Sequence, residues 1–229
     1  MVTDNFYSSE QGFDEFVRDH TEGYVGQSSF LFCFVKRIFD LGASLFGLML
    51  ILPLLPFIVL LIKLETPGPI FFKQLRVGFR GRIFHCYKFR SMAVDAENQK
   101  EHMQHLNEAT GAAFKIKDDP RITGVGRFLR RSSLDEFPQL FNVFIGDMSI
   151  VGPRPQIPSE VGDYTPAHAR RLLVKPGLTC LWQVSGRSHL DFQEWMELDQ
   201  EYVRQAGLKM DFHVLTRTLP AVIERKGAY

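Results

Sequence analysis

The chain has 229 residues, of which 45% are hydrophobic and 23% are charged. This length supports one large domain or two small ones, and this composition excludes both wholesale disorder and a protein of many membrane spans. The 27 basic and 26 acidic residues give no net positive field, so we expect no nucleic-acid partner. The three cysteines lack the spacing of a zinc site or a disulfide framework, which favours a reducing compartment.

The chain opens with a polar, acidic head over residues 1–35, which contain six acidic residues and one basic residue. An uncharged apolar segment follows from Leu41 to Ile62. As a helix it would be about 33 Å long, close to the thickness of a bilayer core. A soluble core helix of this length and apolarity is a less favoured alternative.

Two features of the apolar segment favour a re-entrant hairpin. Pro53 and Pro56 lie near its middle, and proline bends a helix. Basic residues flank both ends, which is typical of a segment whose two ends lie in the cytoplasm: Lys36, Arg37, Lys63, Lys73, Arg76, Arg80 and Arg82. A single span with a proline kink remains the alternative from these residues alone.

Beyond residue 63 the pattern predicts a mixed α/β domain. Short strands are expected at 70–72 and 83–87, on either side of a turn at 78–81. Helices are expected over 93–107, 133–145, 193–205 and 210–223. The last of these suits either a core or a membrane surface.

The segment 130–136 carries the most informative chemistry. Ser133 and Glu136 have the spacing of a capping box, which predicts a helix that begins at Ser133. A helix N-terminus attracts anions, so it would keep Asp135 ionised and, with Arg130 upstream, would receive a phosphate. An ionised aspartate there can bind a divalent metal or attack phosphorus. A purely structural cap explains the same spacing.

Further basic residues lie beside rigid or glycine-bearing segments. Lys88 and Arg90 occur in YKFRSM, Arg154 lies between two prolines, and Arg187 ends QVSGR. Arginine binds phosphate through two parallel hydrogen bonds, so several such sites in one domain predict oxyanion recognition. Neither a Walker loop nor a dinucleotide-binding glycine pattern occurs in the sequence.

These segments together resemble the small monotopic phosphoglycosyl transferases, the bacterial sugar transferases that act on polyprenyl phosphate, of the exopolysaccharide-initiating type. The resemblance runs from Lys36 to Tyr229. It rests on ordered blocks: KRIFD (36–40), the apolar segment, YKFRSM (87–92), DDPRIT (118–123), SLDEFPQLFNV (133–143), GDMSIVGPRP (146–155), KPGLTCLWQVSGR (175–187) and Asp199 to Tyr202. One departure is Cys180, where the family usually carries glycine.

The resemblance implies a helix-rich α/β fold with a single cytoplasmic catalytic domain. A re-entrant membrane hairpin, broken at Pro53, and amphipathic interfacial helices would anchor this domain to the bacterial inner membrane. The implied division is a tail over 1–35, a hairpin over 36–63 and a catalytic domain over 64–229.

The implied reaction transfers a sugar 1-phosphate, a hexose 1-phosphate by the resemblance, from a UDP-sugar to undecaprenyl phosphate. Its products are undecaprenyl diphosphosugar and UMP, and it would initiate synthesis of an exopolysaccharide or another glycoconjugate. Asp135 of the Asp135–Glu136 dyad would attack phosphorus and would also bind Mg²⁺. The substrate-binding residues would be Lys88, Arg90, Arg130, Arg154, Gln183 and Arg187. The sugar and the pathway stay open, and so does a homodimer.

Two alternatives to this reaction remain. The first is a membrane-anchored scaffold that binds polyanions without catalysis, in which Asp135 is only a cap residue. The second is a transferase in which the lipid attacks the donor directly and Asp135 is only a metal ligand. Trapping a phosphosugar on the protein in the absence of the lipid acceptor separates all three.

Overall fold

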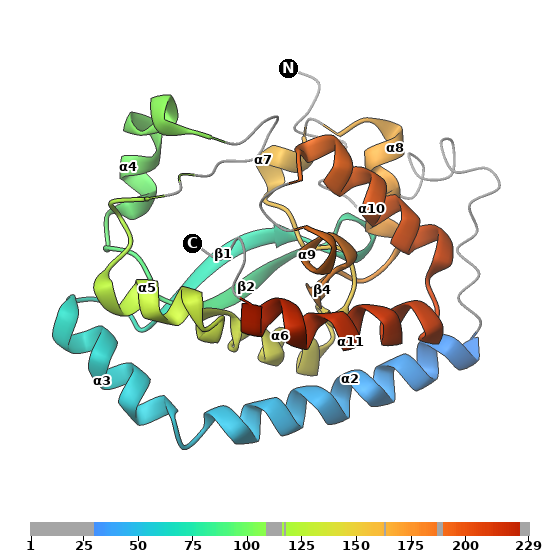
Figure 1. Cartoon of the computed structure of the whole chain (residues 1–229), viewed down its shortest axis with the longest axis horizontal. Helices are drawn as coiled ribbons and strands as arrows, with labels where there is room; N and C mark the ends of the chain where they lie inside the picture. The colour runs from blue at the N-terminus through green and yellow to red at the C-terminus, as the bar shows by residue number, and fades with distance from the viewer. Residues whose placement is uncertain (1–29, 109–115, 117, 163, 187–189, 225–229) are drawn as a thin grey trace.

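Helices surround two small sheets in this protein (Figure 1). The structure is a computed structural model that describes residues 30–108, 116, 118–162, 164–186 and 190–224. The α-helices are α2 (Phe30–Ile51), α3 (Leu55–Glu65), α4 (Ala96–His102), α5 (Gly124–Arg131), α6 (Gln139–Ile145), α7 (Pro158–Val161), α8 (Pro166–Ala169), α9 (Leu181–Ser185), α10 (Phe192–Gln205) and α11 (Leu208–Glu224). The 3-10 helices are η1 (Phe79–Gly81), η2 (Gln104–Leu106), η3 (Leu134–Glu136) and η4 (Arg170–Leu173). This confirms a helix-rich α/β fold.

The first sheet is the hairpin that the sequence predicted. Strand β1 (Phe71–Val77) pairs antiparallel with β2 (Ile83–Phe89), and Gly81 at the turn has φ +75°. Alternation along β2 places Lys88 on the same face as the buried Phe84 and Cys86. Lys88 is therefore the last side chain of a row that faces the core, and it lines a cavity next to the core.

The second sheet joins two motifs that are distant in sequence. Strand β3 (Ser149–Val151) pairs parallel with β4 (Gly177–Thr179). A Cβ atom at Gly152 would collide with the backbone of Lys175, so only glycine allows this approach. The pairing holds the Pro-Arg-Pro segment 153–155 beside the Lys-Pro-Gly segment 175–177.

The apolar segment forms two helices with a break at residues 52–54. Pro53 lies inside the break, and Pro56 occupies the first turn of α3, where proline is tolerated. Helix α2 begins at Phe30, so residues 30–35, which the sequence suggested as tail, are helical. Among the described residues no single helix has the length and hydropathy to cross a membrane; α2 and α3 reach both only as a pair, bent by 61°.

One face of α2 packs against the rest of the protein. The buried carboxylate of Asp40 accepts hydrogen bonds from Ser149 Oγ (3.0 Å) and from the N–H of Ile150 (2.9 Å). Arg37 donates to the carbonyls of Val143 and Phe144, which lie in the last turn of α6. These contacts orient α2 relative to α6 and β3.

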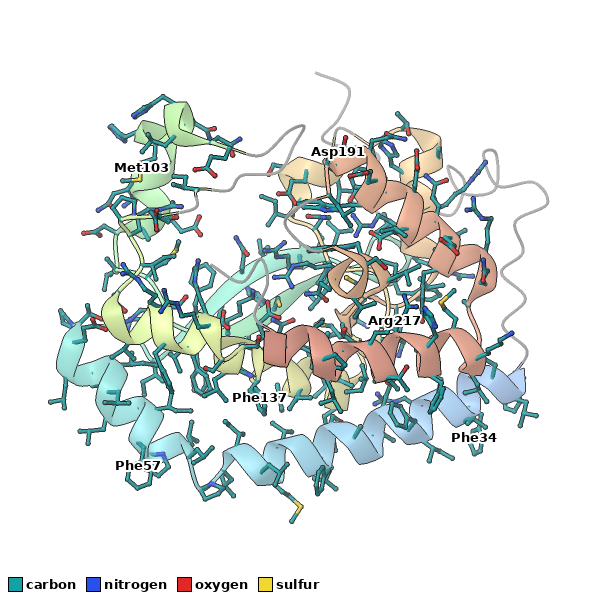
Figure 2. All side chains as sticks on the ribbon, viewed as in Figure 1. Phe34, Phe57, Met103, Phe137, Asp191 and Arg217 are labelled. Carbon is teal, nitrogen blue, oxygen red and sulfur yellow. The ribbon has the colours of Figure 1, made fainter. Side chains whose placement is uncertain are left out.

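The opposite face of α2 and α3 is apolar and exposed. Phe34 and Phe57 project from it, away from the other elements (Figure 2). Further exposed side chains there are Leu31, Val35, Ile38, Phe39, Leu41, Leu45, Phe46, Met49, Leu50, Leu52, Leu54, Leu60, Leu61 and Leu64. A continuous exposed apolar surface of this kind marks a site of contact with a membrane or a protein.

Two groups of hydrogen bonds join the end of α3 to α5 and to the end of β2. The Glu65 carboxylate accepts hydrogen bonds from the N–H groups of Gly124 (2.6 Å) and Val125 (2.9 Å), the first turn of α5. Arg90 donates to the carbonyls of Thr66 (2.7 Å) and Pro67 (2.8 Å). The helix pair is therefore joined to the protein at both of its ends.

Candidate active site

A cavity of about 560 Å³ lies above the β1–β2 hairpin. Helix α4 stands on one side of the hairpin, and α9 and α10 stand on the other (Figure 1). The lining includes most of the predicted site residues: Lys88, Arg90, Arg130, Asp135, Glu136, Arg154 and Gln183. It also includes Arg76, which the sequence suggested as a charge flanking the membrane segment.

The dyad is positioned by the anchorage of α6 on β2. The buried side chain of Asn142 accepts a hydrogen bond from the N–H of Tyr87 (3.1 Å) and donates one to the carbonyl of His85 (2.7 Å). The segment just before α6, which carries Asp135 and Glu136, therefore lies next to the end of β2.

The predicted capping box at Ser133 is wrong. Ser133 has φ +56° and its side chain caps nothing, while Asp135 and Glu136 lie in the short helix η3. The α-helix begins only at Gln139, because Pro138 has no N–H to continue a helix from Ser133 but suits a helix start. A left-handed serine beside the dyad is a strained conformation, of a kind that clusters at functional sites.

Glu136 is held by two cations that come from distant parts of the chain. Its Oε1 accepts hydrogen bonds from Lys88 Nζ and Arg154 Nη2, both at 2.8 Å. Burial alone would raise the pKa of Glu136, but the charges of Arg154 and Lys88 hold it well below its usual range. Glu136 is therefore a fixed negative charge whose Oε1 is shared by two cations.

Asp135 is in a different state from its neighbour. It is only 7% exposed, and none of the described residues donates a hydrogen bond to its carboxylate. Burial, together with the charge of Glu136, raises the pKa of Asp135 to about 6, against the pull of Lys88, Arg130 and Arg154. The sequence predicted that a helix N-terminus keeps Asp135 ionised. That cause is wrong: the groups that favour its charged form are Lys88, Arg130 and Arg154. At neutral pH Asp135 is an ionised carboxylate that has no direct partner in the described part of the chain.

The other predicted anion-binding residues have different surroundings. Arg130 lines the cavity, with Nε donating to Ser91 Oγ at 2.9 Å. Arg90 also borders the cavity, but both its terminal nitrogens are occupied by Thr66 and Pro67. Gln183 lines the far side and accepts a hydrogen bond from Cys180 Sγ. Arg187 lies outside the described residues.

Cys180 fits its position without distortion. Its backbone is extended, with φ −144°, which residues with a side chain adopt as readily as glycine. The thiol is buried, and burial raises its pKa well above the usual range. The departure from the family pattern therefore leaves the local backbone ordinary.

Arg171 supports the segment that carries Arg154, although the sequence did not indicate this role. Its Nη2 forms a buried ion pair with Asp199 at 2.6 Å and donates to the backbone carbonyl of Arg154, also at 2.6 Å. Arg171 therefore helps to position the segment that carries Arg154. Nothing in its local sequence, Arg170-Arg171-Leu172, distinguishes it, and the block Asp199 to Tyr202 was the only signal of a partner.

Proteins of similar sequence show which family this chain belongs to. The sequence profile described as bacterial sugar transferase matches residues 31–225. The chain belongs to this family. It is 44% identical to the galactosyl transferase CpsE of Streptococcus agalactiae, over 84% of this chain and 43% of that protein. It is 43% identical to the undecaprenyl-phosphate galactose phosphotransferase of Salmonella typhimurium, over 86% of this chain and 42% of that protein.

A shorter relative matches over most of its length. The exopolysaccharide production protein ExoY of Rhizobium meliloti is 39% identical, over 85% of this chain and 88% of that protein. The chain thus spans less than half the length of the first two relatives but nearly all of this one. The similarity lies in the part of the chain that carries the cavity and the dyad.

Proposed function

We propose that this protein is a phosphoglycosyl transferase that transfers a hexose 1-phosphate from a UDP-sugar to undecaprenyl phosphate. The products are undecaprenyl diphosphosugar and UMP, and the reaction initiates synthesis of an exopolysaccharide or a related glycoconjugate. The names of three relatives support this substrate class: undecaprenyl-phosphate galactose phosphotransferase, undecaprenyl-phosphate glucose phosphotransferase and UDP-galactose-lipid carrier transferase.

One observation carries the proposal: Asp135 is a buried carboxylate without a direct partner among the described residues, in a cavity ringed by cations. In the proposed first step a carboxylate oxygen of Asp135 attacks the phosphorus that bears the sugar. A bond forms between this oxygen and phosphorus, the bond to the UMP oxygen breaks, and UMP leaves. In the second step an oxygen of the lipid phosphate attacks the same phosphorus, and the carboxylate of Asp135 is restored.

The cations around the dyad have two roles in this proposal. Lys88 and Arg154 hold Glu136, and the same groups offer positive charge to the diphosphate that enters beside them. Arg130, held by Ser91, supplies charge from the α5 side. Glu136 keeps these cations in place and keeps the pKa of Asp135 raised, which leaves Asp135 a better nucleophile than an ordinary carboxylate.

The residues present fit a Mg²⁺ ion that binds together with the donor. Among the described residues no group of three or more histidine, cysteine or acidic side chains could hold a metal. Mg²⁺ commonly binds through one or two carboxylates plus substrate phosphates, and Asp135 offers such a carboxylate. When bound, the ion would offset the repulsion between this carboxylate and the diphosphate.

We also propose that α2 and α3 dip into the inner membrane from the cytoplasmic side. Their exposed apolar face and the 61° bend at Pro53 support a re-entrant element. This placement would hold the cavity at the interface, where a soluble nucleotide sugar meets a lipid phosphate. An impermeant thiol reagent tests it in intact cells with Ser28→Cys in a Cys33→Ser background, because Cys33 is exposed. We expect no labelling from outside; labelling there would mean that the segment spans.

The decisive test of the reaction is to trap the phosphosugar on the protein. The full chain in detergent is incubated with radiolabelled UDP-galactose or UDP-glucose, without lipid acceptor. We expect labelled protein, release of UMP, and loss of the label with hydroxylamine, which cleaves acyl phosphates. Asp135→Asn should give no label.

The same experiment distinguishes the two rival functions. If UMP appears only after undecaprenyl phosphate is added, and the protein is never labelled, the lipid attacks the donor directly. If UMP is never released although nucleotide sugar binds, the protein is a polyanion-binding scaffold.

A further inference from the structure

Both tryptophans of the chain meet in the wall of the cavity. Trp182 on α9 and Trp195 on α10 stack nearly parallel, with ring centroids 4.8 Å apart and an interplanar angle of 21°. Both are half-buried, and both line the same cavity as Asp135, Glu136 and Arg154. Nothing in the proposed chemistry uses them.

The stacked pair is not part of the hydrophobic core. Helix α9 contributes Leu181 to a core cluster and α10 contributes Met196, but the adjacent indoles belong to none of the three clusters of buried apolar side chains. Nε1 of Trp195 is buried and meets no hydrogen-bond acceptor among the described residues. The ring is therefore held by stacking against Trp182 rather than by a hydrogen bond.

The side of the cavity next to α4 mixes polar and apolar side chains. Its polar residues include Ser91, Glu97 and the buried ion pair of Asp119 with Arg121 (2.6 Å), and its apolar residues include Met92, Ala93, Val94 and Ile116. The cations that surround the dyad are Lys88, Arg130 and Arg154. The cavity therefore offers an aromatic wall, a group of cations and a mixed wall with some polar groups.

We propose that Trp182 and Trp195 form the platform on which the nucleobase of the donor stacks. This rests on the proposed function, in which the donor is a nucleoside diphosphosugar. Such a donor has a flat base at one end, a hydroxyl-rich sugar at the other and the diphosphate between. With the diphosphate at the cations, the base matches the aromatic wall, and the sugar is left on the α4 side, where Ser91 and Glu97 are polar. Stacking of a base on an aromatic side chain stabilises binding without hydrogen bonds to the base edge.

Tryptophan fluorescence tests the platform directly, because the emission of this chain comes from this pair alone. The full-length wild-type protein in detergent is titrated with UMP and, as a matched control, with ribose 5-phosphate, which lacks only the base. We expect saturable quenching by UMP and none by ribose 5-phosphate or galactose 1-phosphate. Quenching by galactose 1-phosphate but not by UMP would overturn the proposal, since the pair would then hold the sugar. The absence of UMP quenching at concentrations that inhibit turnover would overturn it as well.

Steady-state kinetics supply the second test. Trp195→Ala should raise KM for the UDP-sugar about tenfold or more, the size of one lost base–aromatic stack, and leave kcat nearly unchanged. Trp195→Phe should restore most of the affinity, whereas Phe79→Ala, an exposed aromatic outside the cavity lining, should change nothing. An unchanged KM in Trp195→Ala would assign the pair a purely structural role. If the wild-type protein itself releases no UMP, the proposed function fails, while the titration still decides the platform.

Discussion

Two clusters of charged residues in this protein contain similar side chains but differ in how their carboxylates are paired. The first cluster consists of Asp135, Glu136, Lys88 and Arg154. The second cluster consists of two separate ion pairs, Asp199 with Arg171 and Asp211 with Lys36, the latter joined by the hydroxyl of Tyr202. In the second, Asp199 is paired with Arg171 and Asp211 with Lys36, each at 2.6 Å. In the first, Lys88 and Arg154 bind Glu136, and Asp135 has no direct partner among the described residues.

The comparison shows that burial alone does not leave a carboxylate open to a ligand. The pKa of each buried aspartate, Asp135 and Asp199, is raised to about 6. For Asp199 the cause is burial, opposed by Arg171; for Asp135 it is burial reinforced by Glu136. Of these two aspartates only Asp135 borders the cavity, so only its charge can meet a ligand there.

The largest expected effect is that of Asp135→Asn on turnover. Release of UMP should fall by ~10³-fold or more, the usual cost of losing a nucleophile. Because the folded pKa of Asp135 lies above its unfolded value, its charge opposes folding at pH 7. The variant should therefore gain up to about 3 kcal/mol in free energy of unfolding. UMP assays and urea unfolding in detergent measure the two effects.

A matched control for this substitution is Asp191→Asn. Asp191 is the exposed N-cap of α10, and asparagine caps a helix equally well. This variant should keep both activity and stability. If Asp135→Asn instead destabilised the protein and Asp191→Asn did not, Asp135 would belong with the structural cluster.

Asp199→Asn should affect stability strongly and chemistry little. It leaves Arg171 charged and buried, which typically costs about 3–5 kcal/mol in free energy of unfolding. Removal of the buried charge of Asp199, whose pKa is also raised, offsets part of this cost, and the net effect should still be a loss. Arg171 keeps its hydrogen bond to the carbonyl of Arg154, so the folded fraction should keep its kcat. Replacing both partners, as Arg171→Met with Asp199→Leu, should recover much of the loss. A collapse of kcat in a folded Asp199→Asn protein would contradict the structural role.

The pH dependence of turnover should separate the two clusters further. Turnover should fall as the pH drops through about 6, because a protonated Asp135 is not a nucleophile. In Glu136→Gln the midpoint of the residual activity should move to lower pH, since a neighbouring negative charge is gone. In Asp199→Asn the midpoint should stay in place. A shift in Asp199→Asn alone would assign the titration to the second cluster.

The smallest expected effect is that of Tyr202→Phe. The hydroxyl of Tyr202 donates to Asp211 Oδ1 (2.7 Å), but this carboxylate keeps its ion pair with Lys36 when the hydroxyl is removed. The free energy of unfolding should fall by about 1 kcal/mol, measured by urea unfolding, with turnover unchanged. A loss of turnover larger than the loss of folded protein would place Tyr202 in the chemistry.

Local features of the sequence determined much of the fold. The prolines predicted the break in the apolar segment, which lies at residues 52–54, and the glycines at 78–81 predicted the turn between β1 and β2. The periodicity of residues 193–205 predicted α10, which spans Phe192–Gln205. These predictions hold because each depends on backbone preferences within a few residues. The capping-box prediction was wrong on the same scale, because Pro138 cannot continue a helix that begins at Ser133.

Only the tertiary structure decided which charges are free. Lys88 and Arg154 are separated from Glu136 by 48 and 18 positions, and the fold brings both to the same oxygen. It likewise commits Arg90, expected at the phosphates, to the carbonyls that follow α3, and it pairs Asp199 with Arg171. The sequence names the candidate nucleophile and its basic neighbours. It cannot say which cation neutralises which carboxylate, because charge pairing depends on distances of a few ångströms that long-range packing sets.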